Sequence, residues 1–225
     1  MEALAWVSIA VAIGSALGIA VDEMRRPQRM AVMNAVWPLS ALYLSLVALI
    51  GYGLFGRSHA RGDRSEHTHG SKTGSATLPF STIAIATSHC GAGCALADIA
   101  CGFWISAAGI ELFGSPLWAE YAIDLGAAWL VGIGFQYFAI KPMRDISAGQ
   151  AIVLAVKADT LSILAFQIGM YGWMALVYFV FFAHHHLTAF DPRYWLMMQV
   201  GMVCGFATSF QMNRWLLRVG LKEAM

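Results

Sequence analysis

The sequence predicts an all-α integral membrane protein, a polytopic bundle of about six transmembrane helices that forms one domain over residues 1–225. Hydrophobic residues make up 59% of the chain and charged residues only 12%, whereas soluble domains average about 25% charged residues. A water-soluble fold of this size cannot hide so much apolar surface. Several apolar stretches are also long enough to cross a bilayer, which takes about 20 residues.

Six apolar stretches are candidate spans, at about residues 4–21, 30–55, 82–105, 118–140, 159–183 and 194–217. The third span contains Gly91 and Gly93, and each glycine disfavours a helix by about 1 kcal/mol, so a break is expected to be easiest there. Residues 147–159 are too short to cross again and form either an interfacial helix or an extension of the fifth span. In the first case Asp159 or Thr160 is the N-cap of the fifth span.

Lys and Arg residues orient the predicted bundle, because cytoplasmic loops of membrane proteins are enriched in them. With six spans, both termini share a side with nine such residues, against four on the other side. We therefore expect a bacterial inner (plasma) membrane protein with both termini in the cytoplasm. Residues 56–79, rich in Ser, Gly, His and charge, are expected to form a flexible soluble loop. There His59, His67 and His69 either bind a metal loosely or belong to a solvated linker.

Net charge, glycine spacing and the motifs of the sequence indicate which kinds of partner and activity to expect. A net charge of +1 gives no electrostatic argument for nucleic acid, so the lipid bilayer is the expected partner. Gly14 with Gly18, and Gly201 with Gly205, have the small-residue spacing that brings helices together, and could support a homo-oligomer. The sequence has no nucleophile–base–acid set, phosphate loop or dinucleotide fingerprint, which does not favour an enzyme.

The third span carries an unusual set of polar residues in "TSHCGAGCALADIAC", residues 87–101. Cys90, Cys94, Asp98 and Cys101 fall within an arc of roughly 80° on an ideal helix. His89 points about 100° away from Cys90 unless the glycines open the helix. A charge at the centre of a span costs about 2.5–3.5 kcal/mol, so we expect Asp98 to be protonated, paired or bound to metal.

These residues lead to a metal hypothesis, because thiolate and imidazole suit Cu(I) and Zn(II). The protein would bind or transport a transition-metal ion, with copper favoured. The expected primary ligands are His89, Cys90 and Cys94, and Asp98 and Cys101 are secondary ligands or proton acceptors. Further candidate ligands are the methionine pairs Met170/Met174 and Met198/Met202 and the outer loop His184–His186. The alternative for the cysteines and methionines is that they pack in the hydrophobic core without binding a metal, since Cys and Met are both common in cores.

Two other functions stay open at this point. Cys90 and Cys94 could form a redox pair, which would make the protein a membrane thiol oxidoreductase, although the spacing is not that of thioredoxin-like centres. The protein could also be a non-catalytic membrane scaffold. Separately, Glu120 and Asp124 lie one turn apart and are either a carboxylate pair for a cation or proton, or interfacial acids at a helix start.

Three stretches resemble a known family. They are "TSHCGAGCALAD", residues 87–98, "FQYFAIKPMR", residues 135–144, and "KADTLSILAFQIGMYGWMALVYF", residues 157–179. In these the chain is similar to a bacterial family of membrane proteins known as domain of unknown function 4396 (DUF4396). The resemblance implies an integral membrane protein with several helices. It implies no activity, and no functional residue is carried over from it.

Overall fold

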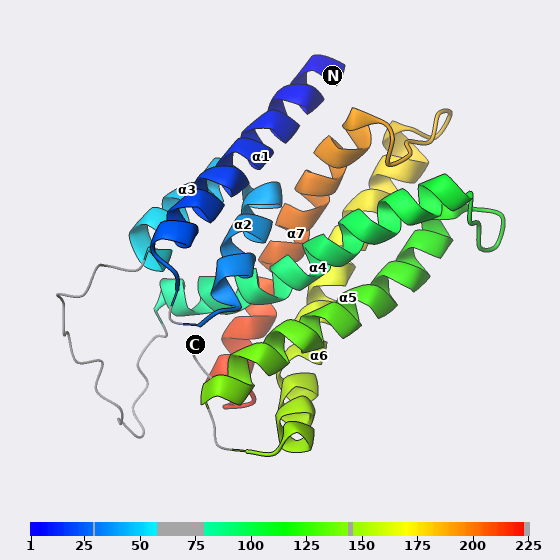
Figure 1. Ribbon diagram of the computed structural model, residues 1–225. Helices are drawn as coiled ribbons and strands as arrows, with labels where there is room; N and C mark the ends of the chain where they lie inside the picture. The colour runs from blue at the N-terminus through cyan, green and yellow to red at the C-terminus, as the bar shows by residue number, and fades with distance from the viewer. Residues whose placement is uncertain (29, 58–78, 144–145, 223–225) are drawn as a thin grey trace.

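The computed structural model describes residues 1–28, 30–57, 79–143 and 146–222, and most of them are helical (Figure 1). The α-helices are α1 (Glu2–Arg25), α2 (Met33–Leu44), α3 (Leu46–Gly51), α4 (Phe80–Ala108), α5 (Pro116–Ile140), α6 (Ala148–Leu176) and α7 (Pro192–Arg218). Short helices of other types follow three of them: η1 (Tyr52–Gly56), η2 (Lys141–Met143) and η3 (Val177–Phe181). Within these residues the only β-type pairing is an isolated bridge between Leu112 and Ser115. The predicted all-α class is confirmed.

Four helical segments are long and apolar enough to cross a membrane: Glu2–Arg25, Phe80–Ala108, Pro116–Ile140 and Ala148–Phe181. They agree with four of the spans expected from the sequence. The fifth long helix, α7, has 27 residues. At 1.5 Å per residue it is about 40 Å long, and so exceeds the hydrocarbon thickness of about 30 Å. It is more polar than the other four, and two of its polar residues, Ser209 and Asn213, are buried in the bundle.

The expected second span, residues 30–55, is not one helix. α2 ends at Leu44, and Ser45 has φ 49° and ψ −122°, which reverses the chain direction. α3 and η1 then return to the starting end, where the Gln28 side-chain amide donates to the Gly56 carbonyl oxygen at 2.7 Å. Arg57 likewise pairs with Asp22 at 3.1 Å. With 12 residues, α2 is only about 18 Å long. Residues 33–56 are therefore a helical hairpin that enters and leaves the bundle on the same side.

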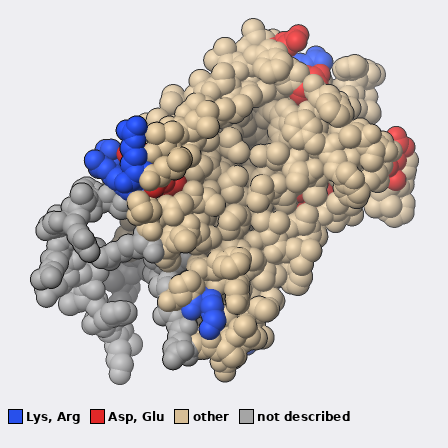
Figure 2. All heavy atoms as spheres, in the orientation of Figure 1, with Lys and Arg blue, Asp and Glu red and all other residues tan. Residues whose placement is uncertain are grey.

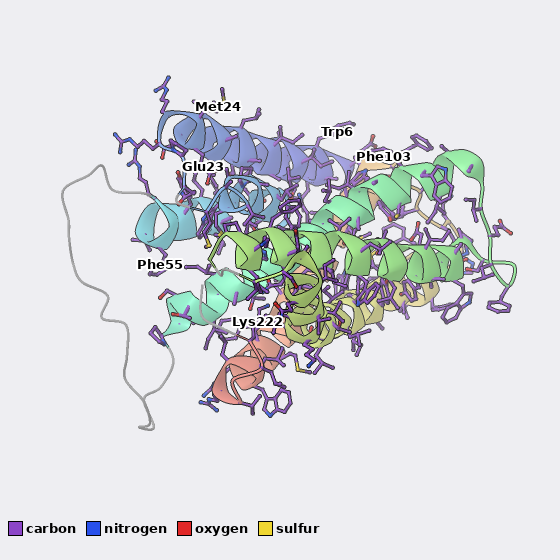
Figure 3. The ribbon with its side chains drawn as sticks, turned by 60° about the horizontal axis from the view of Figure 1, so that its bottom comes forward. Trp6, Glu23, Met24, Phe55, Phe103 and Lys222 are labelled. Atoms are coloured by element: carbon purple, nitrogen blue, oxygen red, sulfur yellow. The ribbon has the colours of Figure 1, made fainter. Side chains whose placement is uncertain are left out.

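This hairpin places the two termini at opposite ends of the bundle (Figure 1). We call the end with the start of α1 and the loops 109–115 and 182–191 the N-side, and the opposite end, where α7 finishes, the C-side. Figure 3 shows Glu23, Met24 and Phe55 at one end and Trp6 and Phe103 at the other. The expectation of both termini on one side was wrong, because it counted residues 30–55 as a crossing.

The expected break in the third span is also absent, since α4 runs without interruption from Phe80 to Ala108. Its glycines instead allow close packing. A Cβ at Gly91 would collide with the Tyr43 hydroxyl, and one at Gly93 would lie 3.0 Å from the Cα of Gly132 on α5. α4 packs against α2, α5, α6 and α7, which makes it the central helix of the bundle.

Residues 147–159 extend the following helix rather than forming an interfacial one. Ser147 is the N-cap of α6: its hydroxyl accepts from the Gln150 backbone N–H at 3.3 Å, and the Gln150 side chain accepts from the Ser147 N–H at 3.1 Å. This capping box satisfies two backbone donors at the helix start. The assignment of Asp159 or Thr160 as N-cap was therefore wrong. Asp159 lies in the body of α6 and is fully buried.

Candidate functional site

The sulfur and oxygen side chains of α4 face the interior of the protein. Cys90 and Cys94 are 0% exposed, Asp98 is 1% exposed and Cys101 is 8% exposed. The helical spacing of these residues predicted that they share a face. Their burial excludes contact with lipid acyl chains.

The five predicted ligands nevertheless lie in three different surroundings. Cys90 and Cys94 are free thiols in an apolar cluster that includes Tyr43, Phe166 and Met170. Asp98 and Cys101 lie one to two turns further along and line a polar pocket.

His89 points elsewhere. Its ring meets the Phe135 ring edge-on at a centroid distance of 6.1 Å, and the charged groups that act on it are Asp159 and Lys222. Among the residues that the structure describes, no three His, Cys, Asp or Glu side chains come together in a way that could hold a metal ion. The predicted set is therefore not one preformed site.

The polar pocket lies between α4, α5, α6 and α7 in the N-side half of the bundle, and we call it the acidic pocket. Its lining combines three carboxyl groups, three tyrosines and three methionines: Asp98, Cys101, Gly102, Glu120, Tyr121, Asp124, Met170, Tyr171, Met174, Tyr194 and Met198. Its cavity volume is about 10 Å³, which is close to the minimum that one water molecule needs. The pocket is thus small, and acidic and soft donors dominate its lining.

Asp98 of α4 and Asp124 of α5 lie next to each other at the base of the acidic pocket. Asp124 is 5% exposed, and its Oδ2 lies 3.5 Å from the Tyr171 hydroxyl. The other three oxygens of the two carboxyl groups have no hydrogen-bond partner within the described part of the chain. Buried polar groups normally have such partners. Two neighbouring carboxyl groups that are both buried need a proton or a cation between them.

A second small cavity adjoins the acidic pocket toward the N-side. Its volume is about 20 Å³, and it shares Glu120, Met174 and Tyr194 with the acidic pocket. It continues to Tyr178, whose ring stacks on His186 at a centroid distance of 3.8 Å. The histidines 184–186 are exposed. They lie on the N-side, at the outer end of this row of cavities.

A second group of buried polar residues lies in the C-side half. Lys222 Nζ contacts Asp159 Oδ1 at 2.7 Å, with both side chains 0% exposed. Asn213 accepts from the Ser162 hydroxyl at 2.8 Å and donates to Thr87 Oγ1 at 3.3 Å. We call these residues, with His89 and Ser209, the C-side cluster. The sequence analysis did not predict the burial of Lys222 or Asn213. A lysine in a polar segment such as residues 218–225 is normally expected to lie in solvent. The only signal was the one-turn spacing of Ser209 and Asn213.

Between the two groups lies a mostly apolar layer that includes Ile163 and Phe166. Gln167 is the polar exception: it is 1% exposed, and its amide has no hydrogen-bond partner among the described residues. Along α4, Asp98 and His89 are nine residues apart, or roughly 13 Å. The two polar groups are thus separate, with one buried amide between them.

The two glycine pairs, Gly14/Gly18 and Gly201/Gly205, differ in whether they are free to contact a second copy of the chain. A Cβ at Gly205 would lie 2.7 Å from the Phe166 carbonyl oxygen, and one at Gly201 would lie 3.2 Å from the Trp173 ring. The Gly201/Gly205 face is therefore used inside the chain, between α7 and α6. Gly14 and Gly18 have no other atom within 4 Å of an added Cβ. Association of two copies through this α1 face stays a prediction.

On the N-side, Asp191 caps α7. Its carboxylate accepts from the Arg193 backbone N–H at 2.8 Å and pairs with the Arg193 guanidinium. The hydrogen bonds from Arg193 lower the pKa of Asp191 below its ordinary value of 3.8. Carboxylates are favoured at helix N-termini for the same electrostatic reason. This pair fixes the start of α7, which carries Tyr194 and Met198 into the acidic pocket.

Comparison with known proteins gives one match. Residues 80–222 match a protein-family model described as "Domain of unknown function (DUF4396)". The matched region contains α4 to α7 and ends at Lys222, so it includes both polar groups but not α1 or the hairpin. No curated protein and no solved structure matches the chain. The expectations for His59, His67, His69 and a flexible loop lie outside the described residues.

Proposed function

The chain belongs to the DUF4396 family, and from its geometry we propose that it carries protons across the membrane, with Asp98 and Asp124 as the central binding site. The observation that carries the proposal is the pairing of two buried carboxyl groups whose oxygens are mostly without partners. Ionisable residues inside membrane spans commonly mark proton and ion pathways. A proton shared between two carboxyl groups removes the repulsion of two neighbouring negative charges.

The polar groups follow a plausible order for such a path. From the N-side the path meets Glu120, then Asp124 and Asp98, which all line the acidic pocket. Gln167 follows, and Asp159 lies in the C-side half. Each of these groups exchanges protons or donates and accepts hydrogen bonds. The apolar layer between the two halves would keep the path closed at rest.

The charge distribution supports an orientation for this path. Of the nine described Lys and Arg residues, seven lie in the C-side half besides the buried Lys222: Arg25, Arg26, Arg57, Lys141, Lys157, Arg214 and Arg218. Only Arg193 lies at the N-side. Figure 2 shows large basic patches at its left and lower edges, which correspond to the C-side in Figure 1. By the positive-inside rule, the C-side faces the cytoplasm. We therefore propose a cytoplasmic C-terminus and an N-terminus on the outer side of the plasma membrane.

Proton flux in liposomes tests the proposal. The purified protein is reconstituted with a pH-sensitive dye inside, and a potassium diffusion potential drives proton entry. We expect wild-type flux clearly above that of empty liposomes, and a loss of at least tenfold in Asp98→Asn and in Asp124→Asn. Glu111→Gln is the matched control, because Glu111 is an exposed N-side carboxyl outside the acidic pocket. Wild-type flux equal to the background, or unchanged flux in both Asn variants, refutes the proposal.

One observation favours a second candidate, the binding or transport of a transition-metal ion. Met170, Met174 and Met198 line the same pocket as Cys101 and the two central carboxyl groups. Thioether and thiol donors favour Cu(I). In this form the metal hypothesis replaces His89, Cys90 and Cys94 by the methionines of the acidic pocket.

Metal analysis of protein purified without a histidine tag separates this candidate from the first. Stoichiometric Cu(I) is expected in the wild type and lost in the double variant Met170→Leu, Met198→Leu. Met202→Leu is the control, because Met202 lies one turn from Met198 on α7 but outside the acidic pocket. Absence of copper from the wild type after loading contradicts this candidate. The redox alternative stays a prediction, which the alkylation of Cys90 and Cys94 under oxidising and reducing conditions would check.

A further inference from the structure

The C-side cluster contains an ion pair that the proposed proton path does not itself explain. Asp159 projects from the middle of α6, and Lys222 lies beyond the end of α7 (Figure 3). Their contact of 2.7 Å is fully buried. A buried ion pair is weak evidence for stability, because removing both charges from water costs about as much as their attraction returns. Stability alone therefore does not explain why this ion pair lies on the proposed path, and a functional role is the remaining explanation.

The backbone after α7 turns back to bring Lys222 inward. Gly220 has φ +72°, a left-handed conformation that glycine adopts without strain. The backbone N–H groups of Leu221 and Lys222 then donate to the Leu216 carbonyl oxygen at 3.0 and 3.3 Å. Such a glycine-based turn is a common way to end a helix. Here it directs a long cationic side chain into the bundle instead of toward water.

The surroundings of Asp159 are those of a cation site with one occupant. Its Oδ1 accepts from Lys222, and its Oδ2 has no hydrogen-bond partner in the described part of the chain. Gly132 on α5 lies beside Oδ2: an added Cβ there would lie 3.7 Å from this oxygen and only 2.6 Å from the Ile163 Cδ1 atom, so the backbone of α5 packs closely against this site. His89 on α4 is near enough for both charges of the pair to act on it, and its ring lies against Phe135 of α5.

We infer that Asp159 is the C-side cation site of the path, and that the Lys222 ammonium occupies it as a tethered cation that a free cation replaces when the C-terminal turn opens. The inference rests on the proposed function, in which cations pass this point. The ligand class is a proton or a small monovalent cation such as a primary ammonium ion, because one carboxylate balances one positive charge. The C-terminal turn is the moving part, because it is held mainly by its two bonds to Leu216 and by the ion pair itself.

Chemical rescue tests the site directly. Lys222→Ala removes the tethered ammonium and leaves space for a free one. We expect propylammonium chloride to raise the thermal unfolding midpoint of this variant in detergent by about 4 °C, as saturating ligands do for small domains. Tetramethylammonium chloride, whose bulky quaternary cation has no N–H to donate, is expected to have no effect. The double variant Asp159→Asn, Lys222→Ala is the matched control and is expected not to respond. An equal response of the single and double variants to propylammonium overturns the inference.

If Lys222→Ala does not fold alone, the same comparison is made on the yield of folded protein expressed with and without propylammonium. Failure of propylammonium to restore the yield also overturns the inference. A second measurement uses Lys222→Met, which keeps most of the side-chain volume. Its proton flux in liposomes is expected to exceed that of the wild type at least threefold, and flux equal to or below the wild type contradicts the closing role of Lys222. The inference alone is rejected if propylammonium does not rescue Lys222→Ala while the wild-type protein shows a proton flux that depends on Asp98 and Asp124. Rescue without any wild-type flux rejects only the proposed function.

Discussion

Replacing Gly93 by Ala tests why the central helix carries its glycine pair. The added Cβ would lie 3.0 Å from the Cα of Gly132 and 3.2 Å from its nitrogen, both of which are backbone atoms. These contacts are shorter than the optimal carbon–carbon separation of about 3.5–4.0 Å, so α4 and α5 must separate locally by a few tenths of an ångström. Overpacking of this kind costs about 1–3 kcal/mol. The same separation acts one to two turns from Asp98.

The matched control is Gly126→Ala on α5, where an added Cβ meets no atom within 4 Å. Both variants gain the same helix propensity, about 1 kcal/mol, so their difference isolates the contact between α4 and α5. We expect Gly93→Ala to be about 1–3 kcal/mol less stable than Gly126→Ala in reversible unfolding in detergent micelles.

Proton flux gives the functional readout of the same pair of variants. A misplacement of about 1 Å can reduce the rate of an enzyme by about 100-fold. We therefore expect Gly93→Ala to lose roughly tenfold or more of its flux, with Gly126→Ala unchanged. Equal stability and equal flux of the two variants would refute the close-packing role of Gly93. That outcome would reopen the alternative in which the glycines permit a break in α4.

Three further predictions concern the caps and the buried pair. Asp159→Asn and Lys222→Met should each lower the free energy of unfolding by about 3–5 kcal/mol, because each leaves a buried charge without its partner. The double variant should regain most of this loss. Additive losses in a double-mutant cycle contradict this expectation. Asp191→Asn should lose the stability that Arg193 confers through the lowered pKa of Asp191. The difference from the wild type should be constant above about pH 5 and shrink as the pH falls through the pKa of folded Asp191, and a pH-independent difference contradicts that cause. Ser147→Ala should cost about 0.5–2 kcal/mol through the lost capping box, and unchanged thermal unfolding would show that the start of α6 is held by other contacts.

The chemistry of the chain correctly predicted the all-α class, the presence of helices long and apolar enough to cross a membrane, and the burial of the α4 residues Cys90, Cys94, Asp98 and Cys101. Apolar stretches of about 20 residues are typical of helices that lie in lipid. The spacing of four, four and three residues between Cys90, Cys94, Asp98 and Cys101 determines that these side chains share a helical face. The stretch 30–55 misled this reasoning, because composition does not distinguish one long helix from two short ones. The reversal at Ser45 needs a positive φ at a residue that usually avoids it.

Sequence alone therefore determined the helical class of this protein, the helices that are long and apolar enough to cross a membrane, and the buried sulfur and carboxyl groups on α4, since these depend on composition and on local helical geometry. Only the tertiary structure decided that Asp98 meets Asp124, that His89 packs against Phe135, and that Lys222 folds back into the bundle. The physical reason is that these pairs are far apart along the chain. Their contacts depend on how α4 to α7 cross and on which helices reach both sides of the membrane, and no local pattern encodes either one.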